Sequence, residues 1–133
     1  MKRNTLSGII IEAAIFVHRE LGPGLLESVY QSCLSKELQL RGVEHRVEVP
    51  VSLHYRGERI PGEGFRLDLL VEDQIVVELK SVEKVQPVHL KQLLTYLKLA
   101  DKPLGLLINF NEFLLKNGIM RVANGSLFDD AIQ

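Results

Sequence analysis

An apolar run at residues 104–110 restricts the possible folds more than any other feature of this sequence. The run is far shorter than the ~18 residues that a membrane-spanning helix needs, so it indicates a strand that is buried on both faces. A strand is buried in this way where helices cover a sheet from both sides. We therefore expect an α/β fold in which helices flank a mixed β-sheet.

Hydrophobic periodicity predicts the other elements of this fold. Helices are expected at residues 7–21, 25–41 and 87–100, and strands at residues 47–55, 65–71, 75–80, 104–110 and 119–123. The three residues at 72–74 separate two of these strands and indicate a hairpin. Gly57 and the segment 61–64 are interpreted as breaks between elements, Pro50 as a sign of an edge or bulged strand, and the tail after Asn124 as frayed.

The length and charge of the chain limit its organisation and its partners. Its 133 residues suit a single domain, assigned to residues 1–133. A net charge of -1 excludes a protein that coats nucleic acid through a general basic excess, so a phosphate-bearing partner needs a local patch or metal ions. The single cysteine, Cys33, excludes a disulfide framework and a cysteine zinc site. Since neither a signal peptide nor a membrane span is recognised, we expect a cytoplasmic protein with no membrane partner.

Ionisable side chains in the hairpin form the most informative chemical pattern. Glu78 and Lys80 alternate with apolar residues in their strand, so they share one face. A three-residue loop at 72–74 sets Asp68 directly opposite Glu78, whereas a two-residue loop would separate them onto different faces. The three-residue loop therefore predicts that the two carboxylates converge.

Two carboxylates that face each other in a sheet repel unless a cation lies between them. Hard oxygen ligands suit Mg2+ or Mn2+, and Lys80 could orient or help to deprotonate a water bound to such a metal. The alternative is that Asp68, Glu78 and Lys80 are ordinary solubilising charges on an exposed face. Acidic residues are disfavoured in strands, which moves the balance toward a functional site.

Two short motifs lie on either side of the hairpin in the sequence. The pattern G-x-x-E-x-x-Y begins the second expected helix, and the pattern Q-x-x-x-Y lies in the helix that follows the hairpin. With the acidic residues and lysine of the hairpin, the residues concerned are Gly24, Glu27, Tyr30, Asp68, Glu78, Leu79, Lys80, Gln92 and Tyr96. This ordered set resembles the GxxExxY proteins of the PD-(D/E)XK nuclease superfamily. The resemblance covers a core at about residues 5–123 and implies a restriction-endonuclease-like core for the domain.

The resemblance also implies a metal site. Asp68 and Glu78 would hold a Mg2+ or Mn2+ ion, with the backbone carbonyl of Leu79 as a further ligand. Lys80 would position the attacking water. Glu27 would reach the same site from its helix, either directly or through water. The alternative for Glu27 is that it only interacts favourably with the dipole of its own helix.

The implied function is metal-dependent hydrolysis of phosphodiester bonds in a nucleic acid, with DNA favoured over RNA. Gln92 and Tyr96 would line the site or contact the nucleic-acid backbone, although Tyr96 could simply belong to the core. A homodimer would extend the length of duplex that so small a domain can cover. Two other functions stay open: a nucleic-acid or protein binding module that keeps the fold without cleavage, and an interaction protein whose motif serves dimerisation.

Overall fold

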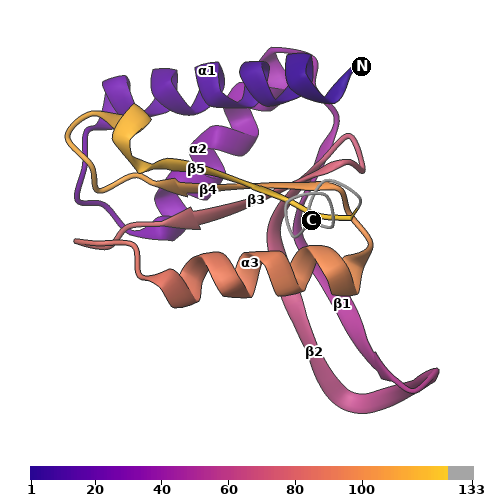
Figure 1. The fold of residues 1–133 in the computed structure, drawn as a ribbon. Helices are drawn as coiled ribbons and strands as arrows, with labels where there is room; N and C mark the ends of the chain where they lie inside the picture. Colours follow the sequence, from indigo (N-terminus) through magenta and orange to yellow (C-terminus); the bar gives the residue numbers. More distant parts are fainter. Residues whose placement is uncertain (126–133) are drawn as a thin grey trace.

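A mixed five-stranded sheet forms the centre of the computed structural model, which describes residues 1–125 (Figure 1). The helices are α1 (Arg3–Leu21), α2 (Glu27–Leu40) and α3 (Pro87–Ala100), together with a short 3-10 helix η1 (Leu115–Gly118). The strands, in their order across the sheet, are β1 (His45–Tyr55), β2 (Glu58–Val71), β3 (Ile75–Lys80), β4 (Leu104–Asn109) and β5 (Ile119–Ala123). Strands β3 and β4 are parallel, and the other neighbours are antiparallel. The predicted α/β class and the mixed sheet are confirmed.

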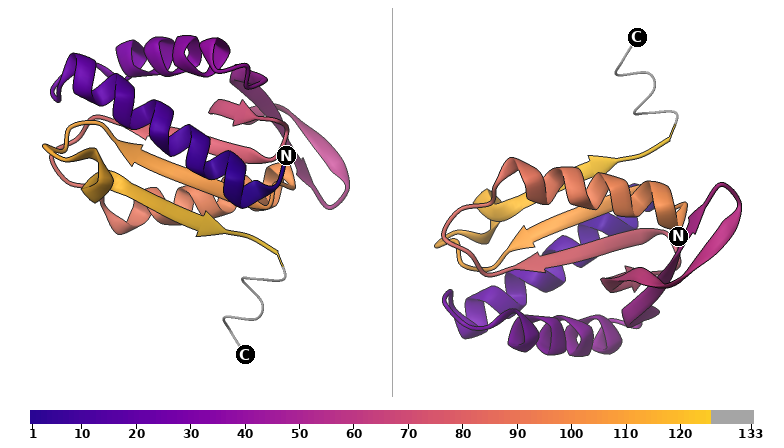
Figure 2. Two further views of the ribbon diagram at one scale, coloured as in Figure 1. Left: turned by 90° about the horizontal axis from the view of Figure 1, so that it is seen from above. Right: turned by 90° about the horizontal axis from the view of Figure 1, so that it is seen from below.

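Apolar side chains pack on both faces of the sheet. Strand β4 is buried along its whole length, as its apolar sequence predicts. Figure 2 shows α1 and α2 on one side of the sheet and α3 on the other. On the first side Tyr30 stacks on Phe110, with ring centroids 4.4 Å apart. On the second side Gly105 lets α3 come close, because a Cβ there would lie 2.9 Å from the Leu93 side chain.

The ends of some elements differ from the sequence-based prediction by a few residues. Helix α1 begins at Arg3, before the expected start at residue 7, and α2 begins at Glu27, after the expected start at residue 25. The expected fraying after Asn124 falls almost entirely outside the described residues. None of the helices in the described part of the chain is long and apolar enough to cross a lipid bilayer.

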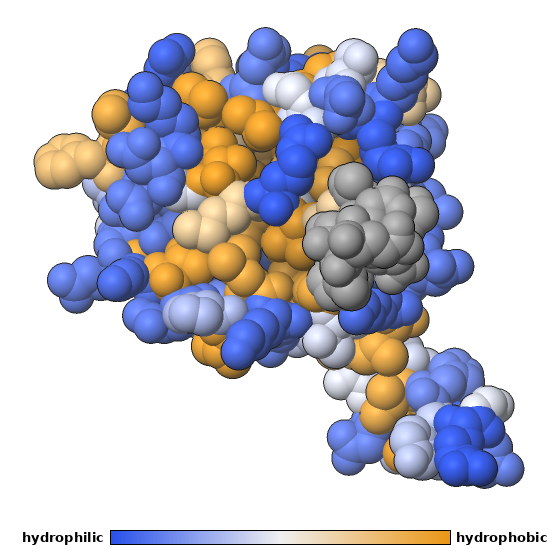
Figure 3. Space-filling model, viewed as in Figure 1, coloured by the Kyte–Doolittle hydropathy of each residue, from blue (hydrophilic) through white to orange (hydrophobic). Residues whose placement is uncertain are grey.

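Strands β1 and β2 form a hairpin that extends well beyond the rest of the sheet (Figures 1 and 3). Strand β2 begins at Glu58 and runs through the segment 61–64, so the prediction that this segment separates two elements was wrong. Gly64 shows why the segment stays in the strand: a Cβ there would lie 2.6 Å from the carbonyl oxygen of Val51. Glycine therefore permits a close approach of the two strands, and does not end one of them.

The hairpin closes in a two-residue turn at its far end. Arg56 and Gly57 form this turn, and both have positive φ, at 52° and 83°. Two residues with positive φ are typical of the tight turns that match the twist of a hairpin. Strand β1 lies at the edge of the sheet, as Pro50 predicts. We refer to residues 50–66 as the arm.

Candidate active site

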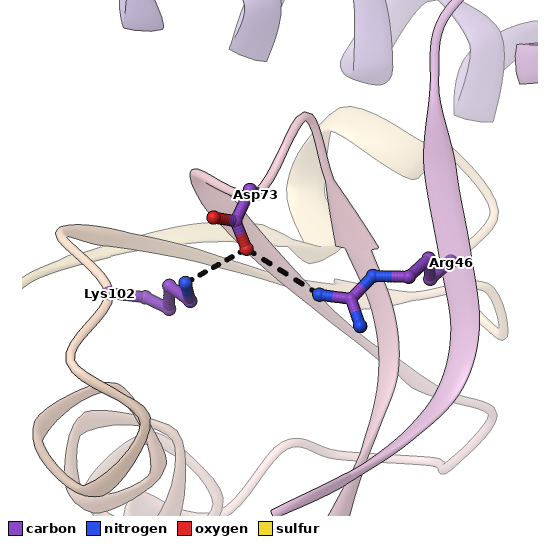
Figure 4. Close-up of polar contacts among 3 residues, drawn as sticks. All are labelled: Arg46, Asp73 and Lys102. Atoms are coloured by element: carbon purple, nitrogen blue, oxygen red, sulfur yellow. Dashed lines mark hydrogen bonds and ion pairs between the residues drawn. The ribbon is translucent and has the colours of Figure 1, made fainter.

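The three-residue loop between β2 and β3 is held in place by charged side chains. Asp73 accepts hydrogen bonds from Lys102 Nζ at 2.9 Å and from Arg46 Nη2 at 3.5 Å (Figure 4). The hydrogen bond and charge of Lys102 hold the pKa of Asp73 below its usual range. These exposed contacts add little stability, but they join the loop to β1 and to the segment after α3. The ladder beside this loop pairs Val71 with Ile75, so the register predicted for a three-residue loop is confirmed.

Asp68 and Glu78 meet at the point where β2 and β3 separate. The backbone ladder ends at the pair Leu69 and Val77, and side chains replace the ladder at the next position. Asp68 N donates to Glu78 Oε1 at 3.4 Å, and Leu79 N donates to Asp68 Oδ2 at 2.8 Å. The structure therefore brings both carboxylates into the gap between the two strands.

Two acidic side chains and one basic side chain meet at this gap. Burial raises the pKa of Glu78 to about 9, and the charge and hydrogen bond of Asp68 contribute to this increase. The charge of Lys80 opposes the increase, which places Lys80 near Glu78, but its effect is smaller. Glu78 therefore keeps a proton at neutral pH unless another cation compensates the pair.

Helix α3 brings Tyr96 to the same gap. Burial raises the pKa of the Tyr96 phenol, and the charges of Glu78 and Asp68 raise it further. The ring of Tyr96 stacks on Phe65 of β2, with centroids 4.3 Å apart and an interplanar angle of 12°. Gln92 lies one turn earlier on α3 and is exposed. Tyr96 thus borders the acidic pair, whereas Gln92 lies on the surface of the helix.

Glu27 lies at the rim of the site, beyond the end of β3. Its side chain accepts a hydrogen bond from Ser81 N at 3.3 Å, and the Ser81 hydroxyl donates to the carbonyl of Leu25 at 2.6 Å. Glu27 is exposed. Among residues 1–125 no three acidic, histidine or cysteine side chains lie close enough to hold a metal ion together. Glu27 is therefore next to the residue that follows Lys80, and it is not a third member of the acidic pair.

The donor atoms in the gap suit a hard divalent cation. Within an extended strand, the N–H and C=O groups of one residue point toward the same neighbouring strand. Because the Leu79 N–H points at Asp68, the Leu79 carbonyl oxygen faces the same gap. Mg2+ is usually held by one or two carboxylates and keeps several waters. Asp68, Glu78 and this carbonyl are a set of that kind.

Asn109, which was not predicted from the sequence, fixes the chain directly after Lys80. Asn109 is 1% exposed at the end of β4. Its Oδ1 accepts from Val82 N at 3.1 Å and from Asn111 N at 3.2 Å, and its Nδ2 donates to the Val82 carbonyl at 2.9 Å. The signal in the sequence was a single amide side chain inside the apolar run at 104–110.

The raised pKa of Glu78 predicts that the metal-free protein loses stability as the pH rises. This pKa is about 9 in the folded protein, against an ordinary value of 4.5 for a glutamate side chain. Between these values the folded state binds more protons than the unfolded state, so the free energy of unfolding falls with pH, by at most about 1.4 kcal/mol per pH unit. Urea unfolding in EDTA, repeated across this pH range, gives the free energy of unfolding at each pH. This free energy should fall with pH in the wild type and should fall less steeply in Glu78→Gln. Equal slopes for the two proteins would contradict the buried, uncompensated carboxyl.

Comparison with known proteins agrees with this arrangement. The chain matches the family profile of the PD-(D/E)XK nuclease superfamily over residues 4–122. Searches of curated proteins and of solved structures gave no match. The family match includes β1 to β4, most of β5 and nearly all residues of the three helices. It therefore contains both strands that carry the acidic pair. This chain belongs to the PD-(D/E)XK nuclease superfamily.

Proposed function

We propose that this protein is a nuclease that uses Mg2+ or Mn2+ to hydrolyse phosphodiester bonds of a nucleic acid. The observation that carries the proposal is the convergence of Asp68 and Glu78 in the gap between β2 and β3, with Lys80 beside them. Membership of a nuclease superfamily supports the same reaction class. The G-x-x-E-x-x-Y pattern at Gly24, Glu27 and Tyr30 further suggests the GxxExxY branch of that superfamily.

Asp68, Glu78 and the carbonyl oxygen of Leu79 would hold the cation. When bound, the cation supplies an activated water and stabilises the charge that develops on the phosphate. Its positive charge would also offset the negative charges of the two carboxylates, whose repulsion contributes to the raised pKa of Glu78. Each of these protein groups offers an oxygen atom, which Mg2+ and Mn2+ prefer over softer ligands.

Lys80 would position the attacking water and share in its deprotonation. Lys80 lies on the same strand as Glu78, and its charge reaches that carboxyl. The Asn109 amide holds Val82, two residues further along the chain. This support limits how far the end of β3 can move, and a positioned proton-transfer group depends on such placement.

The remaining residues of the two motifs would act at the edges of the site. Tyr96 borders the acidic pair from α3 and would contact the phosphate or the water near it. Gln92, exposed one turn away, would contact the nucleic-acid backbone. Glu27 would act through a water, because its carboxylate is engaged with Ser81 N. We expect a cytoplasmic enzyme that acts on DNA in preference to RNA, and a homodimer is the state that we expect on large substrates.

A nuclease assay tests the proposal. The wild type is incubated with single-stranded and duplex DNA and RNA, in Mg2+, in Mn2+ and in EDTA, and hydrolysis of bis(4-nitrophenyl) phosphate is measured in parallel. Cleavage that requires the metal and stops in EDTA is the expected result. If neither the small ester nor any nucleic acid is cleaved, while nucleic acid still binds, the non-catalytic binding module is the better description.

A further inference from the structure

We infer that the arm, residues 50–66, binds duplex DNA in B form next to the bond that is cleaved. The inference rests on the proposed function, and it names the substrate class and the surface that selects it. The arm extends away from the body of the protein past the end of α3 (Figures 1 and 3). Beyond Leu69 in the direction of the arm, β2 pairs only with β1. The arm is therefore a two-stranded ribbon with free edges and one free face.

One face of the arm is used to attach it to α3. Val51 and Phe65 form a ladder pair, and both pack against the apolar cluster that α3 shares with the sheet. Phe65 also stacks on Tyr96. Side chains alternate along a strand, so the next ladder pair, Pro50 and Arg66, points away from α3. The base of the arm is thus anchored through one face, while Arg66 is exposed on the other.

Arg59 lies on the same outward face as Arg66. Its Nε donates to Ser52 Oγ at 3.4 Å, and Ser52 pairs with Gly64, which also belongs to the outward face. Glu58 is the direct neighbour of Arg59 and pairs with Tyr55, so alternation places it on the opposite face. The register shifts between Arg59 and Gly64, so residues 60–63 lie outside the regular ladder. At the paired positions of the arm, the outward face therefore has two arginines and no carboxylate, which favours the approach of a polyanion.

The position of the arm relative to the acidic pair fits a continuous nucleic-acid strand. Arg66 is two residues from Asp68, which corresponds to at most about 7 Å of extended chain. Successive nucleotides rise about 3.4 Å along one strand of B-form DNA. Measured along the backbone of β2, the base of the arm therefore begins within about two such steps of the acidic pair. Arg59 would contact the backbone further from the site.

The shape of the arm favours duplex DNA over duplex RNA. The major groove of B-form DNA is about 12 Å wide and admits a two-stranded β-ribbon. The major groove of an A-form RNA helix is deep and narrow, and side chains do not reach its floor. At the tip of the arm, Arg56 is exposed and lies in the turn that follows β1. Tyr55 is 67% exposed and pairs with Glu58 on the opposite face. The Arg56 side chain is therefore the tip group that is available to a groove.

The test is equilibrium binding to labelled duplexes, measured by fluorescence anisotropy at several salt concentrations. All proteins carry Lys80→Ala so that the substrate stays intact. The double variant Arg59→Gln/Arg66→Gln removes two charges from the outward face. The matched control Lys2→Gln/Lys36→Gln removes two exposed charges near α1 and on α2. The probes are one duplex DNA and a duplex RNA of the same sequence.

We expect the arm variant to bind duplex DNA roughly 10- to 100-fold more weakly near 0.1 M salt. The slope of log K against log [salt] should correspond to about two fewer phosphate contacts. The control should stay close to the parent, and the parent should bind duplex RNA more weakly than DNA. A single variant, Arg56→Gly, places glycine at a position with positive φ, which glycine adopts readily. It should therefore keep the turn at the tip and remove about one phosphate contact. Urea unfolding of each variant shows whether it is folded.

Two results would overturn the inference: equal DNA binding by the arm variant and the control, or an equal loss of affinity on duplex RNA. A failure of the nuclease proposal would appear in the hydrolysis assays and not in the binding measurements. If the wild type hydrolyses no ester and no nucleic acid, the nuclease proposal fails, whereas the comparison of binding between the arm variant and its control still decides the role of the arm.

Discussion

Lys80→Ala is expected to slow phosphodiester cleavage by roughly 10²- to 10⁴-fold, the usual contribution of a positioned proton-transfer group. The affinity for the metal should stay nearly the same, because a lysine ammonium donates hydrogen bonds and does not coordinate a cation. Loss of the positive charge should also raise the pKa of Glu78 further, since Lys80 now opposes that increase. The measurements are single-turnover cleavage and metal titration of the same two proteins.

Lys84→Ala is the matched control for this variant. Lys84 is an exposed lysine in the loop directly after β3, so its removal changes the net charge equally without touching the acidic pair. Its cleavage rate should stay within about threefold of the wild type, as is usual for an exposed side chain away from the reaction. If Lys80→Ala cleaves as fast as Lys84→Ala, the water is positioned by another group.

Local sequence patterns were sufficient to predict the acidic pair. The distance in sequence between Asp68 and Glu78 is short, and one loop of three residues fixes how their strands align. The prediction of a direct ladder pair needs one refinement. The ladder stops at Leu69 and Val77, and the carboxylates instead accept hydrogen bonds from backbone N–H groups. Each carboxyl group thereby gains a backbone donor that a continuous ladder would have used for its own hydrogen bonds.

Contacts between distant segments could not be predicted in the same way. Glu27 is placed by its bond to Ser81 N, more than fifty residues away along the chain. Asn109 acts through Val82, across the whole of α3. Neither contact leaves a periodic pattern in the sequence, because each depends on how finished elements pack together. A polar residue in a buried strand, as at Asn109, is the kind of exception that can be noticed but not interpreted from sequence alone.

The arm was missed for a different reason. Glycine and proline usually mark the end of a strand, so the segment 61–64 was interpreted as a break. In the structure Gly64 instead allows the two strands to approach closely. Net charge was similarly uninformative, because a total of -1 does not reveal that Arg59 and Arg66 share one face of a ribbon.

Asp68→Asn should remove most of the stabilisation that Mg2+ or Mn2+ gives to the folded protein. A ligand at about 100 times its Kd stabilises the folded state by about 2.7 kcal/mol, and the variant should show almost none of this gain. Asparagine keeps an oxygen that can accept the hydrogen bond from Leu79 N, so the variant isolates the charge from the structural contact. It should also bring the pKa of Glu78 down, because the charge of Asp68 contributes to the increase. Unfolding is followed during a metal titration.

Asp73→Asn separates a site effect from a general loss of acidic charge. Asp73 lies in the loop that joins the two strands of the acidic pair, but it contacts Lys102 and Arg46 and not the gap. Removing its charge weakens exposed ion pairs, which contribute little, and should leave the response to metal intact. If Asp68→Asn gained as much stability from Mn2+ as the wild type and Asp73→Asn, the cation would have to bind elsewhere. The assignment of Asp68, Glu78 and the Leu79 carbonyl as ligands would then be wrong, even if cleavage still required a metal.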